Sequence, residues 1–465
     1  MEKQLIQRAS YLNIQDKDLL LKAIVTAKKA HDGQFRKSGE PYIIHPFAVT
    51  DILLDYKVDV ATLIGALLHD VVEDTEYTLE DIQQLFGEQI KTIVHGLTKI
   101  DKNEVPEKDI YQAVNFKNML EAAQKDIRVV VIKVADRLHN MRTLQVKKIE
   151  KQVPYASETL KIFTPFCQKL NLFRIQEELE DLSYAYLHNG QYTQIKSFHK
   201  NYKELFKSYA NRVREEFRKA SKGCLDIDSY TIHDEVEPLY TAMTYPDIID
   251  HIGRVVISVP DKMSCYSAMG IVHQLYKPIS GKFIDYISIQ SNPFHRYLRT
   301  TIDIDGNEVV ICIQDKESKD IREKGICFFL TEHREQELRT TLPKILGEVI
   351  TTNKSATEDP LEFLNFVSNE LLGNQIAVFT PKLDVIQLPI GATAIDFAFA
   401  LNVEKAKQMA AVRINGEIRP VSTPVSQWDM VEILISRYPG DKSSWLNFAF
   451  TTKAQLAIRE ELEKE

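Results

Sequence analysis

The stretch VATLIGALLHDVVEDT, residues 60–75, decides the fold we expect for the N-terminal part of the chain. Its apolar residues recur at intervals of three and four, which places them along one stripe of an amphipathic α-helix. The stripe comprises Val60, Leu63, Ile64, Leu67 and Leu68. The helix ends in the polar pair His69-Asp70, and Glu73 and Asp74 follow one turn later. This run of ionisable side chains at one helix end indicates a site for chemistry.

A second amphipathic helix lies further along the chain. Apolar residues between Ile127 and Met141 form one stripe of this helix, and a different face is polar. The polar face carries Asp136, His139, Asn140 and Thr143. Together with the helical patterns around them, these two helices predict an all-α domain over residues 1–195.

The pattern changes after residue 195, as expected for a chain of 465 residues, about three times a typical domain length. In residues 196–340, runs of β-branched residues alternate with helical patterns, which predicts a mixed α/β domain. Asp305-Gly306 predicts a hairpin turn between two of these runs. Residues 341–374 predict a helical linker, residues 375–437 a small β-grasp-like module, and residues 438–465 a polar tail.

The composition narrows the functional classes. The formal net charge is −8, so bulk charge does not attract nucleic acid or a membrane surface. The five cysteines form no C-x-x-C pair, and their odd number favours a reducing compartment. The N-terminus lacks a signal-peptide pattern, and no stretch has the roughly 18 apolar residues that span a bilayer. We therefore expect a cytoplasmic protein without a membrane span.

Four residues have the chemistry of a metal site. His45 lies in EPYIIHP, and His69, Asp70 and Asp136 lie on the two helices described above. Two imidazoles and two carboxylates suit a divalent cation that keeps open positions for water and phosphate. An adjacent His-Asp pair with a further histidine before it and an aspartate after it is typical of HD-type metal phosphohydrolases.

The acidic residues beside this pair strengthen the prediction. Glu73 and Asp74 follow Asp70 at i+3 and i+4, so a continuing helix aims them at the same side. Carboxylates this close repel one another unless a cation is present. We expect the cation to lower the pKa of a bound water, and Glu73 and Asp74 to orient or deprotonate that water. An isolated His-Asp pair is otherwise a cap or a surface pair, and we do not interpret His31-Asp32 as a ligand pair.

Candidate substrate contacts lie near the same residues. Arg36 and Lys37 precede His45 in the loop QFRKSGEPY, where a guanidinium could stack on a purine or pair with phosphate. The alternative is a solvated basic turn. The polar residues on the face of Asp136 could contact a sugar or a base.

Longer motifs connect these observations to a known family. AHDGQFRKSGEPYIIHP, GALLHDVVEDT and KVADRLHNMRTL resemble the three signatures of the hydrolase domain of the Rel/Spo stringent-response family. CYSAMGIVHQLYKPISGKFIDYIS resembles the family's nucleotidyltransferase-like synthetase domain, and VFTPKLDVIQLPIGATAIDFAFALN resembles its TGS module. The resemblance covers nearly the whole chain, with the domains in the same order.

The resemblance implies a role for each candidate residue. The implied ligands of a metal ion, usually Mn²⁺, are His45, His69, Asp70 and Asp136. The implied catalytic acids are Glu73 and Asp74. The implied nucleotide-binding residues are Arg36, Lys37, Asn140 and Thr143. The implied reaction removes pyrophosphate from the 3′ position of guanosine tetra- or pentaphosphate, the alarmone (p)ppGpp, and leaves GDP or GTP.

The second domain departs from the family pattern at positions that carry synthesis. Ile284 replaces an expected lysine, Val310 replaces the catalytic glutamate and Gln314 replaces an arginine. Residues 233–237, HDEVE, replace a basic stretch, although Asp250 still matches the magnesium-binding aspartate. Pyrophosphoryl transfer from ATP needs cations on the phosphates and a carboxylate for magnesium or the attacking hydroxyl. We therefore predict a folded pseudo-synthetase without synthetase activity.

Two other functions stay open on sequence alone. One is an HD phosphohydrolase of another nucleotide, for example of the 2′-phosphate of NADPH. The other is a regulator that binds the alarmone or GTP without turnover. The TGS module either binds a regulatory partner or packs against the enzyme domains. Long family members continue into ribosome-contacting domains, whereas this chain ends soon after SSWLNFAFTTKA, so ribosome binding is not expected.

Overall fold

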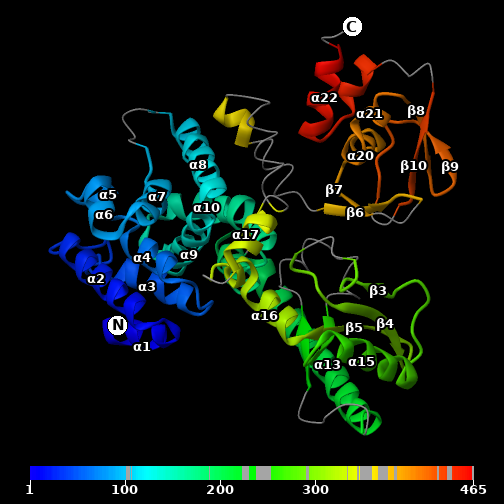
Figure 1. Ribbon diagram of the computed structural model, residues 1–465, viewed down its shortest axis with the longest axis horizontal. Coiled ribbons are helices and arrows are strands. Elements are labelled where there is room, and N and C mark those ends of the chain that lie inside the picture. The colour runs from blue at the N-terminus through cyan, green and yellow to red at the C-terminus, as the bar shows by residue number, and fades with distance from the viewer. Residues whose placement is uncertain are drawn as a thin grey trace. The chain divides into compact units, whose positions relative to one another are not determined.

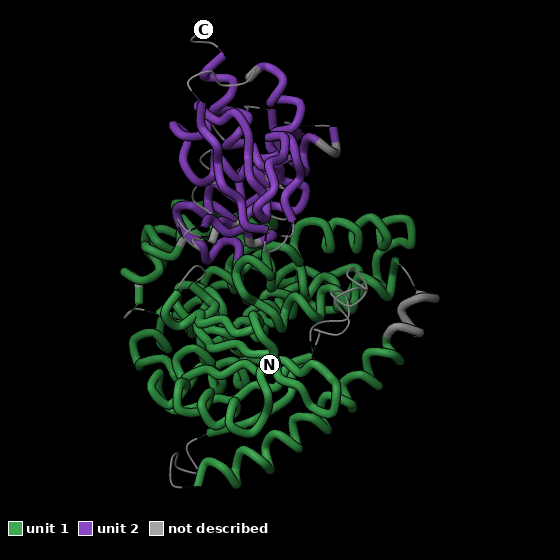
Figure 2. Tube along the Cα trace, turned by 90° about the vertical axis from the view of Figure 1, so that its right-hand side faces the viewer, with its two compact units in different colours: residues 1–95, 131–341 green, residues 96–130, 342–465 purple. Residues whose placement is uncertain are grey.

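The computed structural model describes residues 1–100, 105, 107–187, 189–222, 230–236, 253–289, 293–331, 334–342, 345, 359–364, 375–381, 385–426, 429–436 and 442–462. The chain forms two compact units, one of residues 1–95 and 131–341 and one of residues 96–130 and 342–465 (Figure 2). The helices and strands of both units are labelled in Figure 1.

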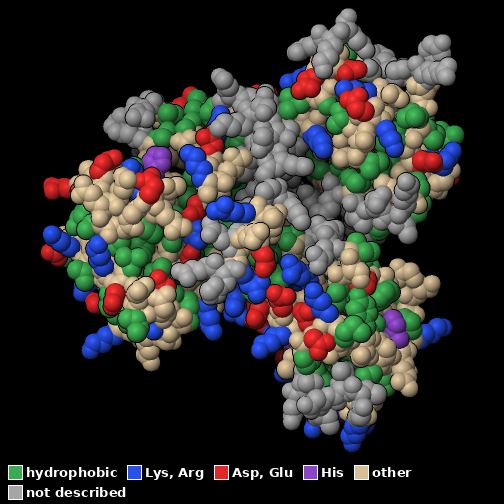
Figure 3. Space-filling view, viewed as in Figure 1, with side chains coloured by type: hydrophobic (Ala, Val, Ile, Leu, Met, Phe, Trp, Pro, Cys, Tyr) green, Lys and Arg blue, Asp and Glu red, His purple; other side chains and the backbone are tan. Residues whose placement is uncertain are grey.

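The N-terminal part of the first unit is helical, which confirms the predicted helical fold class, although residues 96–130 of the predicted domain 1–195 belong to the second unit. Its helices are α1 (Glu2–Arg8), α2 (Ile14–Ala30), α3 (Ile44–Leu54), α4 (Val60–Leu68), α5 (Val71–Asp74), α6 (Leu79–Phe86), most of α7 (Glu88–Leu97) and of α9 (Arg128–Arg142), α10 (Ile149–Glu158), α11 (Thr164–Lys169) and α12 (Phe173–Leu187). On the face shown in Figure 3, acidic and basic side chains are interspersed over this part, in keeping with the modest net charge of −8.

Helix α4 is the central helix of this part. It begins after Asp59, whose side chain accepts a hydrogen bond from the backbone N–H of Thr62 at 3.1 Å. Every residue from Ala61 to Leu68 is buried, so the helix is covered on all sides and not only along its apolar stripe. A Cβ atom on Gly65 would lie 2.7 Å from Cγ2 of Ile93, which explains why the face opposite the stripe is built from small residues.

The rest of the first unit is the predicted mixed α/β domain. The long helix α13 (Asn189–Ala220) leads into a sheet with the strand order β1-β2-β5-β4-β3, in which only β2 and β5 pair in parallel. The strands are β1 (Thr231–Val236), β2 (Gly253–Val259), β3 (Ile284–Asp285), β4 (Leu298–Ile304) and β5 (Asn307–Asp315). Asp305 and Gly306 have φ angles of +54° and +83° and form the predicted hairpin turn between β4 and β5.

The two faces of this sheet differ. Helices α13 and α15 (Lys262–Leu275) pack against one face, in a core that contains Val255, Ile257 and Ile311. Because side chains alternate along a strand, the intervening residues lie on the other face. There Val256, Val310 and Cys312 form a small apolar cluster. The chain continues through α16 (Lys316–Lys324), the short 3₁₀ helix η5 (Gly325–Phe329) and α17 (Glu335–Leu342).

The second unit contains α8 (Lys108–Lys125) and the predicted TGS module. The module combines the strand pair β6 (Gln375–Phe379) and β7 (Val385–Pro389) with a three-stranded sheet of order β10-β8-β9. The latter strands are β8 (Met409–Ile414), β9 (Glu417–Arg419) and β10 (Val431–Ile435). Helices α20 (Ala394–Leu401) and α21 (Val403–Ala406) connect the two sheets, and Asn415-Gly416 forms the turn between β8 and β9.

The segment after β10 is part of the core of this module. Trp445, in the 3₁₀ helix η8 (Lys442–Asn447), is 3% exposed and its ring lies 6.5 Å from that of Phe399. Ile458, in α22 (Thr452–Leu462), is also buried there. The described part of the predicted polar tail therefore completes the module. Most of the predicted linker 341–374 lies outside the described residues.

A helix that crosses a bilayer has to be long and apolar. Within the described ranges, no helix is both long enough and apolar enough to cross a bilayer.

Candidate metal centre

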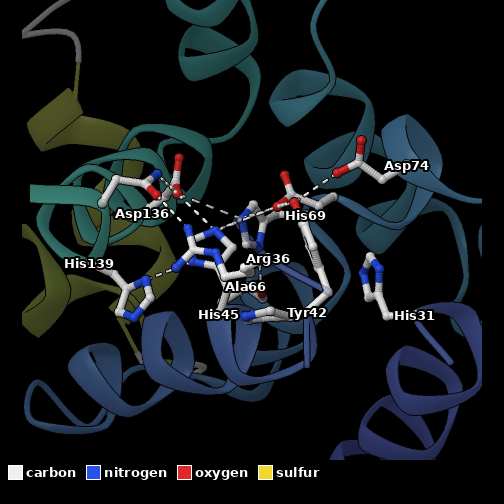
Figure 4. A network of polar contacts seen from close by, with 12 residues as sticks. His31, Arg36, Tyr42, His45, Ala66, His69, Asp74, Asp136 and His139 are labelled. Carbon is white, nitrogen blue, oxygen red and sulfur yellow. Dashed lines mark hydrogen bonds and ion pairs between the residues drawn. The ribbon is translucent and has the colours of Figure 1, made fainter. Parts of the chain in front are cut away.

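The four residues predicted to bind a metal lie close together in the helical part of the first unit, and His45, His69 and Asp136 are labelled in Figure 4. His45 lies in the first turn of α3, His69 and Asp70 connect α4 to α5, and Asp136 lies on α9. Nε2 of His45 is 3.1 Å from Oδ1 of Asp136, 3.2 Å from Nε2 of His69 and 3.5 Å from Oδ2 of Asp70. Nε2 of His69 is 3.2 Å from Oδ2 of Asp70. Residues far apart in the sequence thus bring four potential ligand atoms close together.

The electrostatics of this cluster suit a cation. Burial raises the pKa values of Asp70 and Asp136, but the hydrogen bonds and charges of His69 and His45 outweigh burial and hold both values well below the usual range. Burial lowers the pKa of His69, but the charge of Asp70 raises it to about 9. The ionised carboxylates favour a positive charge at this point. His45, His69 and Asp70 each offer one ligand atom within 4.8 Å of the others, and Oδ1 of Asp136 lies 3.1 Å from Nε2 of His45, so these donors suit a divalent metal ion.

The candidate catalytic acids lie next to the cluster on α5. The hydroxyl of Tyr42 is 2.7 Å from Oδ2 of Asp70 and 2.8 Å from Oδ2 of Asp74, so it joins a candidate ligand to a candidate base. The amide of Gln34 donates to the backbone carbonyl of Asp74 at 2.8 Å. Glu73 precedes Asp74 on the same short helix and is half-buried.

The candidate substrate residues take different positions. A guanidinium nitrogen of Arg36 donates to Oδ1 of Asn140 at 2.9 Å, and Nδ2 of Asn140 donates to Oδ1 of Asp136 at 2.6 Å. Arg36 and Asn140 therefore lie beside the cluster. Lys37 is exposed in the turn after Arg36, whereas the hydroxyl of Thr143 donates back to a carbonyl of its own helix.

The two histidines of the cluster are held through their other ring nitrogen. Nδ1 of His69 is 2.7 Å from the backbone carbonyl oxygen of Ala66. Nδ1 of His45 is 2.7 Å from Nδ1 of His139. The structure therefore places His139, which the sequence suggested as a sugar or base contact, against a candidate metal ligand.

Sequence reasoning missed Tyr42. This residue lies three positions before His45, within the quoted motif EPYIIHP, and that spacing was the only signal for it. The ring of His31 stacks on Tyr42 with 4.7 Å between ring centroids, and Nδ1 of His31 is 2.8 Å from Oε1 of Gln34. His31 thus supports Tyr42 from outside the ligand cluster, while Asp32 is exposed.

Two of the altered positions of the second domain, Val310 and Gln314, lie on β5 and on the sheet face opposite α13 and α15. Val310 belongs to the apolar cluster on β5, and Gln314 is buried and donates to the hydroxyl of Ser258 at 3.0 Å. Ile284 is half-buried on the edge strand β3. Asp250 and Glu237 lie outside the described residues.

An ion-pair cluster lies at the β1 edge of this sheet. Glu235 on β1 accepts a hydrogen bond from Nε of Arg254 on β2 at 2.9 Å, and it also pairs with Arg322 on α16. Burial raises the pKa of Glu235, but His233 and the two arginines outweigh burial and hold it well below the usual range. One carboxylate of the chain therefore forms ion pairs with both of these arginines.

Comparison with known proteins found two domain families. Residues 23–173 match the HD domain and residues 376–435 match the TGS domain. The first range contains all the candidate metal ligands and catalytic acids, and the second contains β6 to β10 of the C-terminal module.

Related proteins match nearly the whole chain. The chain is 34% identical to the bifunctional (p)ppGpp synthase/hydrolase SpoT of Escherichia coli, over 98% of this chain and 66% of that protein. It is 35% identical to a GTP pyrophosphokinase of Myxococcus xanthus, over 96% of this chain and 60% of that protein. It is 33% identical to a guanosine-3′,5′-bis(diphosphate) 3′-pyrophosphohydrolase of Aquifex aeolicus, over 97% of this chain and 65% of that protein. The chain thus spans slightly less than two thirds of these relatives.

A solved structure was also matched. It is a metazoan orthologue of SpoT described as hydrolysing ppGpp, and it is 28% identical over 37% of this chain and 88% of its own. The TM-score of 0.26 is too low to support a structural comparison.

Proposed function

The chain belongs to the Rel/Spo family, and from that premise we propose that its helical domain, residues 1–195, is a (p)ppGpp 3′-pyrophosphohydrolase that depends on a divalent metal. The convergence of His45, His69, Asp70 and Asp136 around one point is the observation that carries the proposal. Residues 196–340 would form the synthetase-like domain. Residues 375–437 would form the TGS domain, together with residues 442–462, which complete its core.

The roles of the residues follow from their positions. A divalent cation held by the four ligands, Mn²⁺ in our proposal, would act as a Lewis acid toward the phosphate and lower the pKa of a water molecule. Glu73 and Asp74 would orient that water and take its proton, and the hydroxyl of Tyr42 would hold Asp74 in place. The proton would then be available for the leaving 3′ oxygen of the nucleoside.

The cationic residues would bind the substrate. Arg36 lies at hydrogen-bonding distance from Asn140, which in turn contacts Asp136, so a guanidinium is held one residue away from a candidate ligand. In that position Arg36 would form charge-assisted hydrogen bonds with a phosphate of the substrate. We assign Lys37 to the same phosphates and Thr143 to the nucleoside.

We further propose that the second domain does not make the alarmone. The position of the expected catalytic glutamate is Val310, which is 3% exposed and packs with Val256 and Cys312. An apolar cluster offers no ligand for magnesium and no acceptor for the attacking hydroxyl. Glu235 pairs with both Arg254 and Arg322, so a carboxylate of the chain already occupies these two cations where a phosphate would bind.

The test is a pair of assays on the full chain. Incubation with Mn²⁺ and (p)ppGpp should release pyrophosphate, and incubation with ATP and GDP should yield no (p)ppGpp. Asp70→Ala should abolish pyrophosphate release, whereas Asp32→Ala, which alters the exposed member of the His31-Asp32 pair, should retain it. Full activity of Asp70→Ala would refute the metal assignment, and inert wild-type protein would refute the reaction. Release of phosphate from NADPH instead would redirect the assignment to another nucleotide.

A further inference from the structure

The two ring nitrogens of His45 have different surroundings. Nε2 faces the cluster, with Oδ1 of Asp136 at 3.1 Å and Nε2 of His69 at 3.2 Å. Nδ1 faces Nδ1 of His139 at 2.7 Å, and the two ring centroids are 4.9 Å apart (Figure 4). His139 is 8% exposed, so water does not readily replace it as the partner of His45.

We propose that His139 is a positioning residue that fixes His45 as a metal ligand by accepting the proton on its Nδ1 atom. The proposal rests on the metal-dependent function proposed above. A ring nitrogen binds a metal through its lone pair, so the proton of neutral His45 has to lie on Nδ1 when Nε2 is the ligand. Two nitrogens 2.7 Å apart share one hydrogen, which makes Nδ1 of His139 the acceptor. The proton of His139 then lies on its Nε2 atom.

His69 provides an internal comparison. Its Nδ1 atom lies 2.7 Å from the carbonyl oxygen of Ala66, which can only accept, so in neutral His69 the proton lies on Nδ1 and the Nε2 lone pair is available to a metal ion. The hydrogen-bond partner of His69 is a backbone carbonyl group, which is present whatever side chain residue 66 carries. The partner of His45 is a side chain, and the orientation and tautomer of His45 therefore depend on the identity of residue 139.

A matched pair of variants separates the acceptor from the packing. His139→Phe keeps an aromatic ring in the buried space and removes the acceptor. His139→Asn loses the ring but places a carbonyl oxygen at the same number of bonds from the backbone as Nδ1. Arg142→Gln is the control, because Arg142 lies on the same last turn of α9 but pairs with Glu178 and touches no candidate ligand.

The first measurement is the dissociation constant of Mn²⁺ for the full chain without substrate, from the electron paramagnetic resonance signal of the free ion. Loss of a side chain that orients a ligand typically weakens metal binding 10–100-fold, and we expect a change of about that size for His139→Phe. His139→Asn should recover most of the affinity, and Arg142→Gln should bind as the wild type does. Wild-type affinity in His139→Phe, or equal losses in both variants of His139, would overturn the proposal.

The second measurement reads the tautomers in the metal-loaded chain, with the diamagnetic ion Zn²⁺ in place of paramagnetic Mn²⁺. Nitrogen NMR of the ¹⁵N-histidine-labelled wild-type chain should show His45 protonated on Nδ1 and His139 on Nε2. Protonation of His45 on Nε2 would overturn the proposal even if His139→Phe failed to fold. The outcome is separable from the proposed reaction. If the chain binds Mn²⁺ and the variants change its affinity as expected, but no pyrophosphate is released, the positioning role of His139 is supported and the hydrolase function is refuted.

Discussion

The carboxylate of Asp396 joins the C-terminal segment to the core of the TGS module. Oδ2 accepts hydrogen bonds from the backbone N–H and the hydroxyl of Thr393, at 2.7 and 3.0 Å, in a capping box at the start of α20. Oδ1 accepts from the backbone N–H groups of Phe450 and Thr451, at 3.0 and 2.7 Å. Asp396 is fully buried and Thr393 and Thr451 are nearly so, so water does not readily replace the carboxylate as their acceptor. We predict that Asp396→Asn strongly destabilises this module.

The magnitude follows from counting donors. Asparagine has an NH₂ group in place of one of the two carboxylate oxygens. In either orientation of the amide, this NH₂ group faces backbone N–H donors, either that of Thr393 or those of Phe450 and Thr451. Two hydrogen bonds to a charged group are lost at about 1.5–3 kcal/mol each, and at least one buried N–H is left unsatisfied. We expect a loss of about 3–5 kcal/mol. With a urea m-value of about 1–3 kcal/mol/M, the midpoint of unfolding falls by more than about 1 M.

Tryptophan fluorescence reports this transition in the full chain, because both tryptophans, Trp428 and Trp445, belong to the C-terminal part. Glu404→Gln is the isosteric control. Its side chain is 78% exposed in a surface pair with Lys407, and it should change stability by less than about 0.5 kcal/mol. Equal urea midpoints for Asp396→Asn and the wild type would refute the account of Asp396 and the inclusion of residues 442–462 in the module.

Three further predictions concern the first unit. Tyr42→Phe removes the hydroxyl that joins two carboxylates of the candidate site, and it should weaken Mn²⁺ binding by about tenfold or more in the assay described above while leaving the circular dichroism spectrum unchanged. Glu235 has a lowered pKa in the folded chain, so its contribution to stability is present above its ordinary pKa of 4.5 and is lost as the pH falls below that value. Glu235→Gln should therefore be less stable than the wild type at pH 7, with a difference that shrinks on acidification, and a constant difference would contradict the ion-pair account. Gly65→Ala forces a Cβ atom to within 2.8 Å of both Ile93 and Ile132 and should cost about 1–3 kcal/mol in a thermal unfolding experiment, whereas an unchanged melting temperature would show that the packing around α4 can relax.

The sequence predicted the nature of the helical domain well, and its errors have physical causes. The apolar periodicity of residues 60–68 identified α4, but it could not show that the face carrying Gly65 is also covered, because small residues do not contribute to an apolar stripe. The polar composition of the C-terminal segment predicted a tail. Few apolar residues, Trp445 and Ile458 among them, are enough to bury η8 and α22 against the TGS core.

Sequence alone determined the residue types of the candidate centre, the order of the domains and the replacement of charged residues in the second domain, because these are properties of single positions and local patterns. Only the tertiary structure decided which of these residues meet. His45, Asp70 and Asp136 lie on separate segments, and Tyr42 and His139 acquire their roles from distances of 2.7 Å across those segments. Hydrogen bonds of this kind depend on how the helices pack, and no local sequence pattern encodes that packing.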